Sequence, residues 1–357
     1  MGPRTKALVA AGSGITVGFA GLALSALPAG ADDDPALPAI GAEELVTSAL
    51  AARAPAFEGV AEMQNELGLP VVPGMESLDF EAVRVFHDGE ESARVQVERQ
   101  ASELTFVKNA DEAWAYDSQE NTAKRLAWDE ADAAAAKGHA EAELADPSQA
   151  AAEIIERLRP TSDIFVDGTA RVADRAAYEL VLTPKPSEKT LLREVTVAID
   201  EETRVPLRFD VYANGRSEPV LSLGFVDFEL GAQDADLFEF TPPEGAKVET
   251  TEADDVADAA GDAKSSEGLE ERATTVGDGW DTVVVGEAPA DAPAESSVGP
   301  GQDLGGVLEQ IGAPVSGEFG SGTHVQIAVG GVIVTEDGRI AAGAVPRQVL
   351  LDALDQQ

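Results

Sequence analysis

The chain has 357 residues, 44% of them hydrophobic, and this length predicts about two domains because one domain contains roughly 150 residues. Its 66 acidic and 25 basic residues give a formal net charge of −41, which argues against nucleic acid as a partner because such a surface repels phosphate. Cysteine is absent and only three histidines occur. These counts exclude disulfides and thiolate nucleophiles and argue against a histidine-built zinc site, so we expect neither a cofactor nor a metal.

The first 31 residues have the pattern of a secretory signal peptide. Arg4 and Lys6 form a basic start, residues 7–31 carry no charge, and Ala29-Gly30-Ala31 fits a small-x-small cleavage site. The alternative is an uncleaved anchor, because the uncharged run is long enough to cross a bilayer. We predict cleavage after Ala31 and an exported, extracytoplasmic protein, which would be membrane-anchored if the leader were retained.

Residues 41–53 predict a short helix with Leu45 on its apolar face. After it the hydrophobic period changes to two, which indicates strands, expected at residues 83–88, 93–99, 103–109, 113–118 and 123–129. A second helix is expected to begin at Ser148 as its cap and to end at Pro160. Strands then resume at residues 176–183, 193–200, 204–213 and 220–230. Consecutive short strands of this kind predict antiparallel meanders.

The composition changes after the last of these strands. Residues 250–272 contain hardly any large apolar side chain and predict a solvated linker. An isolated strand is expected at 280–287, followed by a hairpin with its turn at Asp337-Gly338, while Gly330-Gly331 is either a bulge or a turn of its own. The predicted units are a leader (1–31), a main domain (32–249), linkers with one strand (250–303) and a C-terminal β-hairpin extension (304–357).

The apolar residues of the two meanders are predicted to share one broad face of a sheet. Only two short helices are available to cover this face, so we expect the sheet to curl and to leave an apolar hollow. The alternative is an ordinary closed core, with the helices and the tail as its cover. The residues expected to line the hollow and to bind a ligand are Val85, Val97, Phe106, Trp114, Tyr116, Leu126, Leu180, Leu182, Val197, Leu207, Phe209 and Leu223.

An apolar loop at residues 67–75 precedes the strand expected at 83–88. Loops normally face water, so an apolar loop either packs against the helices or forms a flap at the mouth of a pocket. The residues that we expect to form this lid are Leu67, Leu69, Pro70 and Val71.

No catalytic signature fits its sequence context. The chain has no GxSxG nucleophile motif, and the glycine-rich segment 12–18 lies inside the leader with no strand before it. Pairs of neighbouring carboxylates are not evidence for acid–base catalysis here, because a chain with 66 acidic residues contains many such pairs by chance. We therefore expect a protein that is not an enzyme.

Several segments resemble the LolA/LolB/RseB-like lipoprotein-carrier superfamily. FEFTPPEGAKV at 238–248 is similar to the closing segment of that superfamily, and VLTPK at 181–185 and the stretch at 108–129 resemble it as well. The segments VDGTARVADRAAYELVLTP at 166–184 and LGLP at 67–70 resemble the actinobacterial LolA-like branch in particular, as does EDGRIAAGAV in the tail.

This resemblance implies a mainly β fold, an unclosed antiparallel β-barrel with a helical lid, that holds acyl chains of lipoproteins or lipids. We also expect the protein to be a monomer. HDGEES at 87–92 is acidic where the carriers have a basic residue near an Arg-Pro step, and simple carriers lack the long C-terminal extension. The extension favours the alternative function, an RseB-like envelope-stress regulator that binds a membrane anti-sigma partner. We predict a carrier as the main function.

Overall fold

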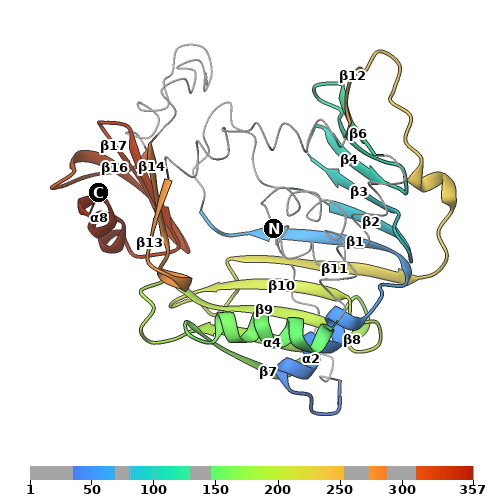
Figure 1. Ribbon diagram of the computed structural model, residues 1–357, viewed down its shortest axis with the longest axis horizontal. Coiled ribbons are helices and arrows are strands. Elements are labelled where there is room, and N and C mark those ends of the chain that lie inside the picture. Colours follow the sequence, from blue (N-terminus) through green and yellow to red (C-terminus); the bar gives the residue numbers. More distant parts are fainter. Residues whose placement is uncertain are drawn as a thin grey trace.

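The structure, a computed structural model, describes residues 35–68, 80, 82–99, 101–128, 146–252, 273–287 and 311–356. Within these residues the chain forms a twelve-stranded sheet, a six-stranded sheet and three α-helices (Figure 1). The larger sheet is antiparallel except at one edge, is not closed into a barrel and carries two of the helices on one face. The predicted fold class, an unclosed antiparallel barrel with a helical lid, is confirmed.

Two meanders, joined through their first and last strands, make up the larger sheet. The first meander contains β1 (Ala56–Asn65), β2 (Ala82–Asp88), β3 (Ala93–Glu98), β4 (Glu103–Lys108), β5 (Glu112–Asp117) and β6 (Thr122–Ala127). The second contains β7 (Ser162–Val172), β8 (Arg175–Pro184), β9 (Leu192–Asp200), β10 (Pro206–Ala213) and β11 (Leu221–Leu230). Strand β1 pairs with β11, and β12 (Lys247–Glu252) is added parallel to β6 at the edge.

The larger sheet is curved, and its register defines a concave face. Directly opposed residues of paired strands project from the same face. One such row contains Val85, Val95 and Phe106 of the first meander, and another contains Phe209 and Val197 of the second. Figure 1 shows β2–β6 rising at an angle from the layer formed by β7–β11.

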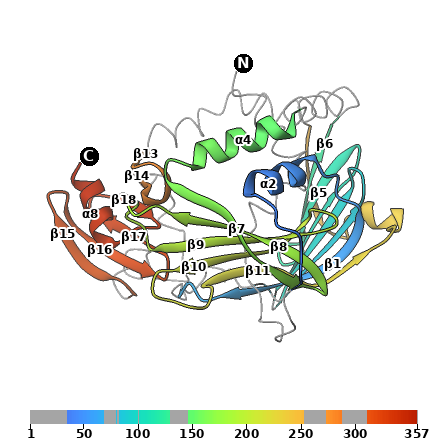
Figure 2. The ribbon, with the colours of Figure 1, turned by 90° about the horizontal axis from the view of Figure 1, so that it is seen from below.

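Helices α2 (Ala42–Ala51) and α4 (Pro147–Leu158) lie together over the concave face of the second meander, as Figure 2 shows. Helix α2 packs through the fully buried Leu45 against a cluster that includes Tyr178 and Ile199. Helix α4 buries Ala151 and Ile155 on its inner side. These two helices are the predicted lid, and they cover only part of the face.

The cap of α4 differs from the predicted one. The carboxylate of Asp146 accepts a hydrogen bond from the backbone N–H of Gln149, and Pro147 occupies the first turn. Proline suits that position because its missing N–H would have no partner there. Asp146, rather than Ser148, is therefore the N-cap.

The main core closes one end of the concave hollow. Strand β7 is interrupted by a bulge next to Gly168, whose φ of +90° favours glycine, and its last residues bend over the sheet. There Ala170 and Val172 pack against Phe57 of β1 and Phe228 of β11. The remaining part of the concave face lies between this core and the opposite end of the strands.

The C-terminal residues form a second, smaller sheet. Its strands are β13 (Ala273–Val276), β14 (Val283–Glu287), β15 (Ala313–Gly317), β16 (Gly320–Ile327), β17 (Gly330–Thr335) and β18 (Arg339–Gly343), in the order β13-β14-β18-β17-β16-β15. Helix α8 (Arg347–Asp355) packs on it and shares its core of Val283, Ile333 and Leu350. The sequence pattern predicts an isolated strand and a hairpin here. In the structure, β14 pairs with β18, and Gly330 follows a turn rather than a bulge.

Several contacts join the smaller sheet to the larger one. The N–H of Leu191 donates to the carbonyl of Ala344 at 2.9 Å, and the N–H of Ala328 donates to the carbonyl of Leu67 at 2.7 Å. The indole Nε1 of Trp280 donates to Oγ of Ser162 at 2.7 Å. Within the described residues, no helix combines the length and apolar character needed to span a membrane.

Candidate functional site: an apolar cavity under the helices

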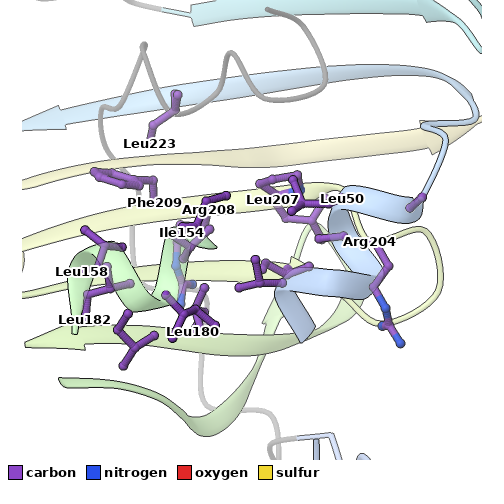
Figure 3. A pocket seen from close by; sticks show the side chains of 18 of the residues that line it. Leu50, Ile154, Leu158, Leu180, Leu182, Arg204, Leu207, Arg208, Phe209 and Leu223 are labelled. Atoms are coloured by element: carbon purple, nitrogen blue, oxygen red, sulfur yellow. The ribbon is translucent and has the colours of Figure 1, made fainter. Parts of the chain in front are cut away.

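A cavity of about 340 Å³ lies between the two lid helices and the concave face of the second meander. We call it the helix-side cavity (Figure 3). Leu50 of α2 and Ile154 and Leu158 of α4 form one wall. The sheet forms the opposite wall, from Ile164 of β7 to Ala61 of β1. Almost every lining side chain is apolar, so the cavity suits an apolar ligand.

Six of the twelve residues expected to line a hollow lie around this cavity. They all belong to the second meander and are Leu180, Leu182, Val197, Leu207, Phe209 and Leu223. Their common face follows from the register, in which Leu180 lies opposite Val197 and Val197 opposite Phe209. The helical residues Leu50, Ile154 and Leu158 are not among those predicted to line a hollow, although Leu158 belongs to the apolar stripe that the sequence predicts for the second helix.

Two arginines line the helix-side cavity, but other groups engage their charges. Arg208 forms ion pairs with Glu179 and Asp210, both at 2.9 Å. Arg204 donates to the backbone carbonyl of Glu201 and lies over the ring of Tyr178, 5.5 Å from its centroid. The cavity therefore offers hydrocarbon surface and, among the described residues, no cluster of three metal-ligating side chains.

A second hollow lies on the concave face of the first meander, and we call it the meander hollow. Its volume is about 400 Å³, and Val95, Phe106 and Leu126 contribute its apolar lining. Phe106 is 43% exposed, which is unusual for a phenylalanine in a sheet. Lys108 and Lys124 lie in the same lining. Burial lowers the pKa of Lys108 despite the opposing charges of Glu91 and Asp88.

The expectation that Trp114 and Tyr116 share a face with Phe106 is wrong. Phe106 lies opposite Ala115, so β5 presents its alanines to the concave side and its aromatic residues to the convex side. There both aromatic rings pack on Phe240, at centroid distances of 5.4 and 5.8 Å. The three-residue connection between β4 and β5 (109–111) sets this register, and the sequence pattern alone does not reveal it. Trp114 still contributes to the lining of the meander hollow.

The other expected residues lie elsewhere. Val85 is on the concave face but is 2% exposed and belongs to the main core. Val97 is also buried and lines neither cavity. Leu67 packs near Ala328 and Val329, at the tip of the β16–β17 hairpin. The rest of the expected lid loop, Leu69, Pro70 and Val71, lies outside the described residues, as do the leader and residues 129–145.

Comparisons with solved structures give several matches of low sequence identity. The chain is similar to an uncharacterized conserved protein from Thermus thermophilus, with 15% identity over 56% of this chain and 91% of that chain and a TM-score of 0.33. MucB in the Pseudomonas aeruginosa MucA/MucB complex matches with 16% identity over 87% of this chain and 94% of that chain, and a TM-score of 0.43. A LolA superfamily protein from Nitrosomonas europaea matches with 13% identity over 57% of this chain and 99% of that chain, and a TM-score of 0.24.

No model of a protein family matches the chain, and neither does any curated protein. The solved structures similar to this chain include a LolA superfamily protein, and the sequence segments resemble the same superfamily. The resemblance to the LolA/LolB/RseB-like superfamily rests on the sequence segments 181–185, 108–129 and 238–248. The actinobacterial branch remains a prediction.

Proposed function

We propose that this chain is a non-enzymatic, extracytoplasmic carrier that holds acyl chains of lipids or lipoproteins on the concave face of its larger sheet. The observation that carries the proposal is the helix-side cavity, which is lined by hydrocarbon from two helices and from β1 and β7–β11. Each buried methylene contributes about 0.8 kcal/mol, so roughly ten buried methylenes contribute about 8 kcal/mol before ordering costs. That corresponds to an affinity near micromolar without any polar contact.

The partial cover of the concave face supports a carrier rather than a closed core. A closed core is packed as densely as an organic crystal and leaves few voids larger than a water molecule. Here Ile154 of the lid is 40% exposed while it lines the cavity, and Phe106 is 43% exposed in the meander hollow. Large apolar side chains that remain accessible in concave positions are typical of surfaces that receive an apolar ligand.

Leu182→Glu tests this proposal, because Leu182 lines the helix-side cavity and is only partly buried. A bound acyl chain would have to desolvate the new carboxylate, at a cost of several kcal/mol, so the affinity for a fluorescent fatty acid should fall at least a hundredfold. The far-ultraviolet circular dichroism of the sheet should persist, because an unoccupied cavity lets water reach the charge.

Val226→Glu is the matched control, because Val226 is 45% exposed on β11 and lines neither cavity. Its affinity for the fatty acid should equal that of the wild type. If the wild type binds no acyl probe, or if Leu182→Glu unfolds, the proposal is wrong. The residues that line the helix-side cavity then form an ordinary closed core.

The second sheet favours one alternative, an RseB-like envelope-stress regulator with a membrane anti-sigma partner. Its six strands and α8 have a core of their own, and the second sheet contacts the larger one through Ala344, Ala328 and Trp280. The two functions differ in the fate of the ligand. A carrier transfers a labelled acyl chain from donor to acceptor vesicles, whereas a regulator retains it and co-purifies in a fixed ratio with one membrane protein.

A further inference from the structure

His324, on β16 of the smaller sheet, is a buried histidine with an unpartnered ring nitrogen. The residue is 5% exposed, and among the described residues no group forms a hydrogen bond with its Nε2. Its ring lies on the same face of the sheet as the core residue Ile333, which is opposite His324 in the register. Most buried polar atoms in native proteins have a partner, so a free one calls for a physical explanation.

The protonated form of this ring does not suit its surroundings. Gly331 of β17 closes the space beside Nε2, because even a Cβ on that glycine would come within 2.7 Å of the nitrogen. A neutral imidazole carries a hydrogen on only one nitrogen, whereas an imidazolium carries one on each. Protonation therefore requires Nε2 to be a donor in a place where no described residue accepts its hydrogen.

The charge near His324 opposes protonation as well. The adjacent strands β15 and β17 place the uncharged Ala313 and Ile333 opposite His324, and α8 begins with Arg347. Burial, and then the positive charge of Arg347, lower the pKa of His324 from its ordinary value of 6.5. No carboxylate of the described residues counteracts these two effects. The fold therefore holds the neutral form of this side chain.

His324 belongs to the hairpin that connects the two sheets. Four residues further along the chain, the N–H of Ala328 donates to the carbonyl of Leu67 at 2.7 Å, and Val329 packs on the cluster that contains Val220. The strand that carries His324 is paired with β17 up to this tip. A change that loosens the hairpin at His324 therefore acts on the contact with the larger sheet.

We propose that His324 makes this hairpin an acid-sensitive connection, which loosens from the larger sheet when the surroundings become mildly acidic. A base whose pKa is lowered in the closed form binds fewer protons there than in the open form, so acid favours the open form. The closed hairpin has its full stability above pH 6.5 and loses stability as the pH falls below that value. This switch operates whether or not the helix-side cavity holds a ligand.

The first test is a proton NMR titration of the imidazole signals, which is simple because the chain has only three histidines. His324→Phe removes one signal and thereby identifies it. The signal of His324 should titrate with a midpoint below pH 6.5, and Arg347→Gln should move that midpoint upward because it removes the nearby positive charge. A midpoint at or above 6.5 in the wild type overturns the switch.

The second test measures the opening of the hairpin by hydrogen exchange at the amide of Ala328, corrected for the intrinsic effect of pH on exchange. From pH 7.5 to 5.5 the opening of the wild type should increase severalfold. The limit is about tenfold, because pH 5.5 is one unit below the ordinary pKa of histidine. In His324→Phe, which keeps an aromatic ring but carries no charge, the opening should not change with pH.

His87→Gln is the matched control, because His87 is similarly buried but lies on β2 of the larger sheet. The acid-induced opening at Ala328 should persist in this variant. If His324→Phe fails to fold, His324→Gln takes its place, since an amide side chain does not titrate in this range. An opening that is independent of pH in the wild type, or that increases equally in a variant without His324, overturns the switch.

Discussion

At the scale of single residues, the ion pair between Arg175 and Asp200 secures the turn that follows β9. Asp200 is 1% exposed and receives two hydrogen bonds from the guanidinium, at 2.7 and 2.9 Å. Burial alone would raise the pKa of Asp200, but the hydrogen bonds from Arg175 and Thr203 outweigh it and lower the pKa. The ionised form is therefore the one that the fold stabilises.

Asp200→Asn should destabilise the larger sheet by about 3 kcal/mol at neutral pH, because it leaves Arg175 without its buried partner. A carboxyl whose folded pKa is lowered contributes stability above its ordinary value of 3.8, and that contribution is lost as the pH falls through the folded value. Urea unfolding at neutral pH and near pH 3 measures the difference. The difference in the free energy of unfolding between wild type and variant should be smaller near pH 3 than at neutral pH. A difference that does not depend on pH would contradict the stabilising role of ionised Asp200.

At the scale of elements, the sequence predicts the strands whose alternation is uninterrupted. The bounds of β2–β6 and β8–β11 agree with the predicted ranges to within two residues. Strand β1 escapes notice because Gly59 occupies a buried apolar position, where a Cβ would come within 2.7 Å of the Phe225 ring. Strand β7 is broken at Gly168 by its bulge, and β12 is almost entirely polar. Local pattern does not identify strands whose packing partners are distant in sequence.

Local sequence pattern also predicts only part of the candidate site. Within the second meander, alternation alone brings six expected residues to one cavity. In the first meander, Trp114 and Tyr116 lie on the opposite face from Phe106 because the length of one connection shifts the register. Because large aromatic side chains usually point toward the buried face of a sheet, their size favours placing Trp114 and Tyr116 on the inner face. Here Phe240 provides them with a separate apolar cover on the convex side.

Helix α4 provides an element-scale prediction. Asp146→Ala removes the side-chain oxygen that accepts the N–H of Gln149, and such changes cost about 1 kcal/mol of helix stability. Because Ile154 and Leu158 line the helix-side cavity, fraying of α4 should also weaken fatty-acid binding severalfold. Ser148→Ala is the control and should change neither the stability of α4 nor the affinity for the fatty acid. Amide hydrogen exchange in α4 and fluorescence titration provide the measurements, and a larger effect of Ser148→Ala would contradict the assigned cap.

At the scale of the whole molecule, the tip of the β16–β17 hairpin connects the two sheets. Ala328 and Val329 pack on a cluster that contains Val220 and Phe209, and Phe209 also lines the helix-side cavity. One end of the concave face is thus filled by the main core, and the other lies next to a separate sheet. The smaller sheet therefore packs on the same cluster as a residue that lines the cavity.

Val329→Asp should separate the two sheets without unfolding either. The carboxylate would lie against Val220, which is fully buried, and burying it without a partner costs several kcal/mol. Small-angle scattering should show a larger radius of gyration, with the circular dichroism of both sheets retained. Val284→Asp is the control, since Val284 is 47% exposed on the same sheet. An unchanged radius in Val329→Asp would show that the hairpin tip does not hold the sheets together.

The pairing of β1 with β11 has a consequence for the order of folding. Phe57 lies opposite Leu230, so this pair closes the longest loop in the larger sheet, whereas the other antiparallel neighbours within each meander are consecutive in the chain. Closing a long loop costs more chain entropy before contacts compensate for it, and such pairings are slow. Each meander is therefore expected to form first as a local unit, and the concave face comes into being only at the final step, when β1 meets β11. Until then the apolar face of each half is open to solvent, so the folding chain is expected to pass through an aggregation-prone intermediate.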